Sequence, residues 1–322
     1  MKVALLLNRD NFETYSDWDG VEWELIHMGN GVPNPDEVIA TGADVLVVDA
    51  VMKIGSDIIL SMPGLKLVHS QGVAFNAIDI DAARSAGVYV CNHAGVNAYP
   101  VAEHVVLLML SLLRKFRQFE DMIYSGGQME AKTSCFKKGL TELGRLKVGI
   151  VGCGAIGRVL TSMLKPFGCK ICYFDVLGDI GLKDAEYTPL EQLYSSCDIV
   201  TLNVPVTPET EGMINSGTLA LFKPGAILIN TARCELIDPE AVASALKSGI
   251  LSGFGTDVLA PEPYSMDNPL LNLPEELRYR ISISPHVAGI TEGTFVREYE
   301  RIRRNIEAIE CGQKLECVVN GL

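Results

Sequence analysis

A strand, a glycine-rich turn and the start of a helix follow one another in residues 146–157, LKVGIVGCGAIG, and this stretch constrains the fold most strongly. Gly152 permits a tight turn, Gly154 lets the backbone approach a pyrophosphate, and Gly157 lets the helix pack closely on the strand. The free N–H groups at the start of that helix attract an anion. These residues predict a phosphate-binding turn in a doubly wound α/β domain.

An acidic residue at the end of the next strand indicates which dinucleotide would bind. Residues 170–174 form an apolar strand that ends at Asp175, about 20 residues beyond the glycine turn. A carboxylate at this place accepts hydrogen bonds from the adenosine ribose and repels a 2′-phosphate. Because no Arg or Lys follows in residues 176–178, we expect NAD rather than NADP as cofactor. The alternative is that Asp175 merely ends a strand.

Chain length and charge limit the classes of protein to consider. A chain of 322 residues is long enough for two domains. The net charge of −13 disfavours binding to nucleic acid or to an anionic membrane surface. An anionic substrate would therefore need a locally placed cation.

The cysteines and the apolar segments indicate the compartment. Nine cysteines form no regular framework, so we interpret them as reduced thiols rather than as a zinc site or disulfides, and we expect no metal. The chain begins with a strand at residues 3–7 and shows no signal peptide, and the apolar run at residues 105–113 is too short to span a bilayer. We expect a cytoplasmic protein without membrane partners.

The first hundred residues alternate short apolar strands with helical segments, which predicts a parallel sheet with right-handed crossovers. They contain no dinucleotide fingerprint, so this half resembles a smaller open α/β domain that supplies loops to a cleft. Strands are expected at residues 3–7, 21–27, 45–48, 66–69 and 88–90, and helices at 35–41, 55–61 and 77–85.

A long helix at residues 97–115 follows, with Pro100 in its first turn. Because Val101–Leu113 is apolar nearly all round, this helix must be buried on more than one side. We interpret it as the connector between the domains, with a second subunit covering part of it. His104, inside the helix, fits a core or interface histidine better than a catalytic one.

The second half again alternates strands and helices, as in a doubly wound fold, where ligands lie outside the carboxyl ends of the strands. Helices are expected at residues 189–197, 215–221 and 239–248, and strands at 198–204, 226–230, 251–257 and 281–284.

Three chemically reactive residues follow successive strands of this second half. Arg233 could hold a carboxylate and polarise a carbonyl, and His286 could protonate the carbonyl oxygen. Glu262, hydrogen-bonded to the imidazole, would orient it and favour its protonated form. The set fits hydride transfer to a 2-oxo acid. Each residue alone could be structural, but three at neighbouring strand ends beside a nucleotide fold favour catalysis.

These segments together resemble the D-isomer-specific 2-hydroxyacid dehydrogenase family, which includes D-lactate, glycerate and phosphoglycerate dehydrogenases. The resemblance covers most of the chain. Its motifs are NAYPVAEH at 97–104, the turn at 144–157 with Asp175, NVPVTPETEG at 203–212, NTARCELID at 230–238, GTDVLAPEP at 255–263 and SPHVAG at 284–289.

The resemblance implies an oxidoreductase with a Rossmann NAD domain at residues 101–289, inserted in a flavodoxin-like substrate domain at 1–100 plus 290–322. It implies homodimers through the Val101–Leu113 helix. It makes Arg233, Glu262 and His286 the catalytic residues. Besides the three glycines, it implies an NAD site lined by Ala155, Ile156, Asp175, Val204, Pro205, Thr210, Thr231, Ala232, Asp257 and Gly289. It also implies a substrate site formed by Gly72, Val73, Ala74, Asn97 and Arg233.

The chain departs from the family pattern at three places. Ala74 replaces the second glycine of the loop that faces the substrate carboxylate, a tryptophan common before the glycine turn is absent, and Cys234 follows Arg233. These departures concern the identity of the substrate more than the class of reaction.

Two other functions remain open beside a 2-oxoacid reductase. An NAD(H)-sensing corepressor-like protein shares this architecture but carries extra tails, and a formate dehydrogenase would carry long insertions. We also expect Cys153 and Cys234 to border the cofactor cleft with lowered pKa, since one thiol lies at a helix N-terminus and the other follows an arginine. The alternative is that both are small residues of convenient size.

Overall fold

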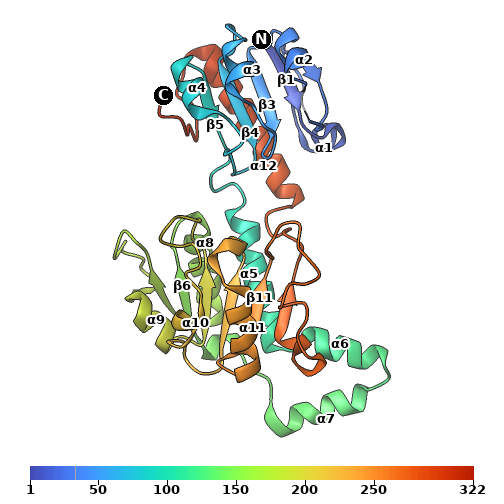
Figure 1. The fold of residues 1–322 in the computed structure, drawn as a ribbon, viewed down its shortest axis with the longest axis vertical. Helices are drawn as coiled ribbons and strands as arrows, with labels where there is room; N and C mark the ends of the chain where they lie inside the picture. Colours follow the sequence, from blue (N-terminus) through green and yellow to red (C-terminus); the bar gives the residue numbers. More distant parts are fainter. Residues whose placement is uncertain (33) are drawn as a thin grey trace. The chain divides into compact units, whose positions relative to one another are not determined.

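The computed structural model describes residues 1–32 and 34–322, which form two compact units. Unit 1 comprises Met1–Asn97 and Ile290–Leu322, and unit 2 comprises Ala98–Gly289. Figure 1 shows both units, and each is described by itself below.

A five-stranded, all-parallel sheet forms unit 1, in the order β2-β1-β3-β4-β5. This is the order of a flavodoxin-like fold, and the predicted parallel sheet is confirmed. The strands are β1 (Lys2–Leu6), β2 (Glu24–His27), β3 (Val45–Asp49), β4 (Leu67–Gln71) and β5 (Tyr89–Cys91). The helices are α1 (Arg9–Tyr15), α2 (Pro35–Ala40), α3 (Ser56–Leu60), α4 (Ile80–Ser85) and α12 (Glu292–Cys311).

Helices cover both faces of this sheet, which explains why its inner strands β1 and β3 are largely apolar. Successive side chains of a strand point to opposite faces, so Val3 and Leu5 of β1 pack with Tyr299 and Ile302 of α12. The alternate residues of β1 and β3 pack instead against α2, α3 and α4.

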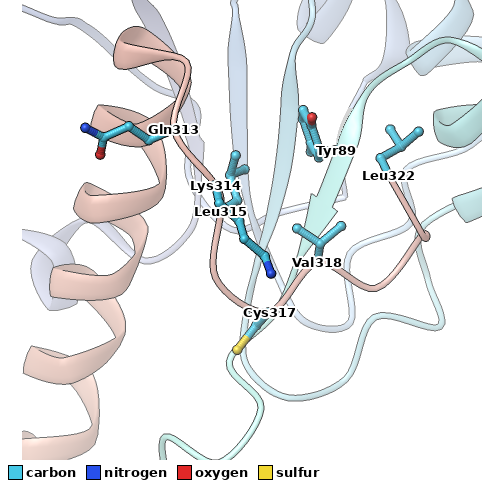
Figure 2. A pocket seen from close by; sticks show the side chains of 7 residues that line it. All are labelled: Tyr89, Gln313, Lys314, Leu315, Cys317, Val318 and Leu322. Carbon is cyan, nitrogen blue, oxygen red and sulfur yellow. The ribbon is translucent and has the colours of Figure 1, made fainter.

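The chain after α12 returns to β5 and closes unit 1. Asn320 accepts a hydrogen bond from Val90 N–H at 3.1 Å and donates to the Val88 carbonyl at 2.8 Å, so this tail is held along the strand. Figure 2 shows the open pocket of about 380 Å³ between the tail and Tyr89. Tyr89 is the first residue of β5, so it marks the amino end of that strand. Because a ligand site of a parallel sheet lies at the carboxyl ends of its strands, this pocket is not at the expected place for a ligand.

Unit 2 contains a seven-stranded parallel sheet in the order β12-β11-β10-β9-β6-β7-β8. The order reverses between β6 and β9, which is where a doubly wound sheet binds its ligand. The strands are β6 (Lys147–Val151), β7 (Lys170–Phe174), β8 (Glu186–Tyr187), β9 (Ile199–Leu202), β10 (Ala226–Asn230), β11 (Leu251–Thr256) and β12 (Ile281–Ile283).

Two groups of helices cover the faces of this sheet. On one face Val105 and Met109 of α5 pack with Leu160 of α8 and with Ile150 of β6. The other face is covered by the remaining crossover helices, α9, α10 and α11. The helices are α5 (Ala98–Leu113), α8 (Ala155–Leu164), α9 (Leu190–Ser196), α10 (Ser216–Leu219) and α11 (Pro239–Ser248). Short 3₁₀ helices are η1 (Leu143–Arg145), η2 (Lys165–Phe167), η3 (Cys234–Leu236) and η4 (Glu275–Arg280).

Two further helices of unit 2, α6 (Phe116–Tyr124) and α7 (Gln128–Lys138), extend away from its sheet (Figure 1). The sequence did not predict them, because α6 has no buried residue and so shows no core-facing pattern within its own chain. Helix α5 is likewise buried on one broad face only, and its Leu107 is 57% exposed. Within the described ranges, no helix has the length and apolar character needed to cross a membrane.

Two histidines are buried in unit 1, with their rings 4.8 Å apart between centroids. His69 donates through Nδ1 to the Ser70 carbonyl and accepts at Nε2 from the Asn305 amide, both at 3.0 Å. Neither ring nitrogen of His93 has a hydrogen-bond partner among residues 1–32 and 34–322. Burial lowers the pKa of His69 to about 4 and also depresses that of His93.

We expect these histidines to destabilise unit 1 in acid. In the unfolded chain a histidine takes up a proton near pH 6.5, whereas the buried rings stay neutral, so stability falls as pH drops from about 6.5 towards 4. In this window each histidine lowers the free energy of unfolding by about 1.4 kcal/mol for each pH unit of acidification. His93→Phe keeps a ring of similar shape, and between pH 7 and 5 this variant should lose roughly 2 kcal/mol less than the parent chain.

Urea unfolding followed by tryptophan fluorescence measures this difference, because both tryptophans, Trp18 and Trp23, lie in unit 1. The comparison between variants is essential, since burial raises the pKa of Glu298 to about 7 and gives the opposite pH dependence. His286→Gln, an exposed histidine of unit 2, is the control and should leave the slope unchanged. Equal pH slopes for His93→Phe and the parent would contradict the assignment.

Candidate active site

The glycine turn at the end of β6 has the geometry that its sequence predicts. Gly152 has φ +89°, and a Cβ there would lie 2.6 Å from the Asn203 carbonyl oxygen. A Cβ on Gly157 would lie 2.4 Å from the Gly152 carbonyl oxygen. A Cβ on Gly154, in contrast, would meet no atom of residues 1–32 and 34–322 within 4 Å. The first and third glycines are thus required by close packing, and Gly154 faces open space.

Helix α8 begins directly after this turn, and no side chain caps its N-terminus. The N–H groups of a first helical turn have no acceptor within the helix, and the helix dipole is positive at this end. Ala155 is exposed and Ile156 is half-buried, so this end is accessible. The open space, the N–H groups and the dipole fit the pyrophosphate of a dinucleotide.

Asp175, the predicted ribose ligand, is half-buried directly after β7. Its Oδ2 accepts a hydrogen bond from Cys153 N–H at 2.8 Å, and its Oδ1 accepts one from Leu177 N–H at 3.1 Å. A carboxylate has about four acceptor sites, so both oxygens can still accept ribose hydroxyls. The carboxylate therefore also ties the glycine turn to the end of β7.

The other predicted cofactor residues lie in the segments after β9, β10, β11 and β12. Thr210 folds back on its own loop, because its hydroxyl donates to the Pro205 carbonyl at 2.7 Å. Ala232 N–H donates to the Asn230 side chain at 3.1 Å. Three more predicted cofactor residues, Val204, Thr231 and Gly289, lie in the same segments and take no part in the hydrogen bonds just described.

His286 and Glu262 are in direct contact. Nδ1 of His286 lies 2.7 Å from Oε1 of Glu262, and the two side chains are 45% and 40% exposed. With Nδ1 donating to the carboxylate, Nε2 remains available for another group. His286 has φ +58°, a left-handed conformation that costs energy in a residue other than glycine.

A buried carboxylate holds the backbone beside this histidine. Asp257 is 1% exposed, and its oxygens accept hydrogen bonds from Val287 N–H at 3.0 Å and Ala288 N–H at 2.8 Å. The Ser284 hydroxyl donates to the same carboxylate at 2.5 Å. Three donors on both sides of His286 thus fix the conformation of its loop.

Arg233 is exposed directly beyond β10, and its guanidinium donates to the Ala232 carbonyl at 2.7 Å. Within the part of the chain that the structure describes, Arg233 forms no ion pair, so its positive charge is available to an anion. Arg233, Glu262 and His286 follow β10, β11 and β12, which are neighbours in the sheet. Only the last two are joined by a hydrogen bond.

The predicted substrate loop of unit 1 follows β4. Gly72 has φ +148°, and a Cβ there would lie 2.8 Å from the Ala50 Cβ. The Val73 carbonyl accepts from the Asn92 amide, and the Ala74 carbonyl accepts from the Ser70 hydroxyl, both at 2.7 Å. The loop carbonyls are thereby turned inward, while Val73 and Ala74 are exposed. Asn97, also predicted as a substrate ligand, is the last residue of the first segment of unit 1.

The prediction of lowered pKa values for two cysteines is wrong. Burial raises the pKa of Cys153 to about 12, with the Asp175 carboxylate adding to the effect. Burial and the Glu235 carboxylate, which accepts from the Cys234 thiol at 3.2 Å, raise the pKa of Cys234 to about 11. The sequence suggested neighbouring positive charge, but in the structure neighbouring carboxylates add to the effect of burial and raise both pKa values.

Sequence reasoning also missed part of the surroundings of His286. His104 was interpreted as a core or interface histidine, and its Nε2 lies 2.7 Å from the Ser284 hydroxyl oxygen. The available signal was the position of Ser284, two residues before His286 in the SPHVAG segment. No group of three His, Cys, Asp or Glu side chains suited to a metal ion occurs within residues 1–32 and 34–322.

Comparison with known proteins agrees with this arrangement. Residues 106–288 match the family described as D-isomer specific 2-hydroxyacid dehydrogenase, NAD binding domain. A glycerate dehydrogenase of Methylorubrum extorquens is 32% identical over 87% of both chains. A glyoxylate reductase of Thermofilum pendens is 33% identical over 83% of this chain and 78% of its own. A formate dehydrogenase of Pseudomonas is 38% identical over 70% of this chain but only 56% of its own.

Solved structures give the same result. D-2-hydroxyisocaproate dehydrogenase superimposes with a TM-score of 0.87 and 27% identity over 100% of both chains. D-lactate dehydrogenase from Aquifex aeolicus, solved with NAD and lactic acid, has a TM-score of 0.76 and 27% identity over 97% of this chain and 96% of its own. The chain therefore belongs to the D-isomer specific 2-hydroxyacid dehydrogenase family, and it is an NAD-dependent oxidoreductase with the two parallel-sheet domains of that family.

Proposed function

We propose that this enzyme reduces a small 2-oxo acid to the D-2-hydroxy acid in the cell, with His286, Glu262 and Arg233 as its catalytic residues. The observation that carries the proposal is the 2.7 Å contact between His286 Nδ1 and Glu262 Oε1, with Arg233 in the loop that follows the neighbouring strand β10. NADH, when bound, supplies the hydride that adds to the carbonyl carbon.

His286 acts as the general acid of the reduction. Its Nδ1 is engaged by Glu262, so its Nε2–H is the donor that can give a proton to the carbonyl oxygen. The carboxylate fixes the orientation of the ring and stabilises the imidazolium that this role requires. In the reverse direction the neutral ring takes the proton back from the hydroxyl group.

Arg233 binds the substrate carboxylate and polarises the carbonyl group. A guanidinium binds a carboxylate through two parallel hydrogen bonds, which fixes orientation as well as charge. The net charge of the chain is −13, so a local cation is needed to hold a small anion. We propose Gly72, Val73, Ala74 and Asn97 as the substrate-binding residues of unit 1.

The cofactor site is proposed along the carboxyl edge of the unit 2 sheet. The pyrophosphate lies on Gly152–Gly157 at the start of α8, and Asp175 accepts the adenosine ribose hydroxyls. We assign residues 101–289 to the NAD domain and residues 1–100 plus 290–322 to the substrate domain. The remaining cofactor contacts are assigned to Val204, Pro205, Thr210, Thr231, Ala232, Asp257 and Gly289.

The names of the relatives guide the choice of substrate. Glycerate dehydrogenase and glyoxylate reductase act on acids with short side chains, so we propose glyoxylate and hydroxypyruvate as the first substrates to test. NADH oxidation at 340 nm should be followed with these two, pyruvate, phenylpyruvate, 2-oxoisocaproate and 3-phosphohydroxypyruvate. Formate with NAD is the contrasting assay. Turnover of formate alone, or of none of these acids, would overturn the proposal.

We further propose a cytoplasmic homodimer. An apolar surface, called here the α5–α7 surface, comprises exposed side chains of α5, α6 and α7. They are Leu107, Phe116, Ile123, Tyr124 and Phe136, between 52% and 84% exposed. Several large exposed apolar side chains on consecutive helices favour an interface. A homodimer of this kind buries the same surface of both subunits, and we place α5 at the centre of that contact.

Catalytic variants test the assigned roles. His286→Ala should lower kcat by roughly 10²–10⁴, the usual contribution of general acid catalysis. Arg233→Ala should lower kcat and raise KM. Arg233→Lys keeps the charge but not the paired hydrogen bonds, so it should recover only part of the lost kcat/KM. Glu262→Gln should move the alkaline limb of the reduction profile to lower pH, because the imidazolium loses its neighbouring anion. If the alkaline limb stays at the same pH in a folded Glu262→Gln variant, Glu262 is not the partner of His286.

Asp175→Asn tests the preference for NADH. The amide oxygen can still accept the Cys153 N–H, so the turn is retained while the charge that repels a 2′-phosphate is lost. We expect the ratio of kcat/KM for NADPH to that for NADH to rise about 5- to 30-fold. Asp184→Asn, an acid that pairs with Lys165 instead, is the control. Equal use of both cofactors by the parent enzyme would contradict the assignment.

Leu107→Glu tests the dimer. A charge at the centre of an apolar contact opposes its burial, so light scattering should report a fall from twice the chain mass to 34.9 kDa. Leu60→Glu introduces the same charge at a residue of α3 in unit 1 that is 61% exposed, and it should leave the dimer intact. A parent chain that is monomeric at micromolar concentration would refute the proposal.

A further inference from the structure

A chain of two hydrogen bonds connects helix α5 with the loop that carries His286. His104 Nε2 lies 2.7 Å from the Ser284 hydroxyl oxygen, and this hydroxyl lies 2.5 Å from Asp257 Oδ1. The side chain of His104 is 15% exposed, and its Nε2 is 3.8 Å from the same carboxylate oxygen. None of the roles proposed above uses His104.

The direction of both hydrogen bonds follows from the number of protons available. The Asp257 carboxylate only accepts, so the single proton of Ser284 must point to it. The Ser284 oxygen then has lone pairs only for His104, and His104 Nε2 must carry a hydrogen. His104 therefore fixes the hydroxyl of Ser284 in the one orientation that serves Asp257.

Asp257 connects Ser284 to the backbone of the loop that carries His286. The carboxylate also accepts the N–H groups of Val287 and Ala288, directly after His286. His286 has φ +58°, from which an L-residue relaxes readily towards negative φ unless its neighbours are held. Such relaxation would turn the imidazole away from Glu262.

We propose that His104 is a positioning residue, which acts through Ser284 and Asp257 to hold His286 in its reactive orientation. This rests on the proposed role of His286 as general acid. His104 touches neither substrate nor His286 in this scheme. Its effect is on the fraction of enzyme in which the acid is correctly placed, so it should appear in kcat rather than in the KM of the 2-oxo acid.

A nearby pair of residues offers a matched control. The Ser282 hydroxyl donates to the Ser111 hydroxyl at 3.3 Å, which also joins β12 to α5 but does not reach Asp257. If His104 merely helped α5 to pack on the sheet, losing the Ser111 contact would have a comparable effect. If His104 positions the loop, only the contact through Ser284 matters.

The experiment compares His104→Phe, His104→Gln, Ser284→Ala, the double variant His104→Phe with Ser284→Ala, and Ser111→Ala. For each, kcat and KM are measured with NADH and the most active 2-oxo acid, together with the melting temperature. His104→Phe keeps the ring and loses the donor, so kcat should fall about three- to tenfold with KM within twofold. His104→Gln, whose amide carries an N–H near the position of Nε2, should restore most of the rate.

Coupling gives the decisive result. Because His104 acts through Ser284, His104→Phe should cause no further loss of kcat in the Ser284→Ala background. Multiplicative losses, an equal loss in Ser111→Ala, or an unchanged kcat in His104→Phe would each overturn the proposal. Should His104→Phe fold poorly, His104→Leu and its double variant with Ser284→Ala provide the same comparison. His286→Ala is assayed alongside: if it retains full kcat, the proposed function fails, whereas its inactivity beside an unaffected His104→Phe rejects only this inference.

Discussion

Parallel pairing of the strands is the constraint on which the candidate site depends. A parallel sheet brings the carboxyl ends of all its strands to one edge, so residues far apart in sequence lie in neighbouring loops. In unit 2, β10, β11 and β12 are adjacent, and the residues after them include Arg233, Glu262 and His286. Burial of both faces by helices leaves this edge as the place where polar side chains and free backbone groups can meet a ligand.

The same constraint explains how much of the fold could be predicted. Strand β10 and helix α11 have the predicted bounds, because turn residues border the short apolar run of β10 and the Asp238 side chain caps the start of α11. Helices α6 and α7 were missed. Their apolar residues Phe116 and Phe136 are 62% and 81% exposed, so they do not face the core on which the prediction of the other helices relied.

For the candidate site, sequence patterns indicated residue types at strand ends but not the partner that each proton would find. Asp175 was predicted as a ribose ligand, and its bond to Cys153 N–H depends on a turn geometry that no sequence spacing encodes. Burial is the main reason why Cys153 does not have a lowered pKa, and the Asp175 carboxylate raises that pKa further. His104 was overlooked as a functional residue because an apolar helix favours a structural interpretation.

The cost of burying a charge accounts for the rigidity around His286. Asp257 is 1% exposed, and an ionised carboxylate at that burial needs donors for its oxygens. Its donors include the backbone N–H groups that follow His286 in the sequence and the hydroxyl of Ser284, which precedes it. A left-handed residue costs about 1–3 kcal/mol, but its relaxation would leave a buried carboxylate short of hydrogen bonds at about 1–3 kcal/mol for each one lost. Because two backbone bonds and one hydroxyl would be lost together, the unfavourable conformation of His286 is the less costly state.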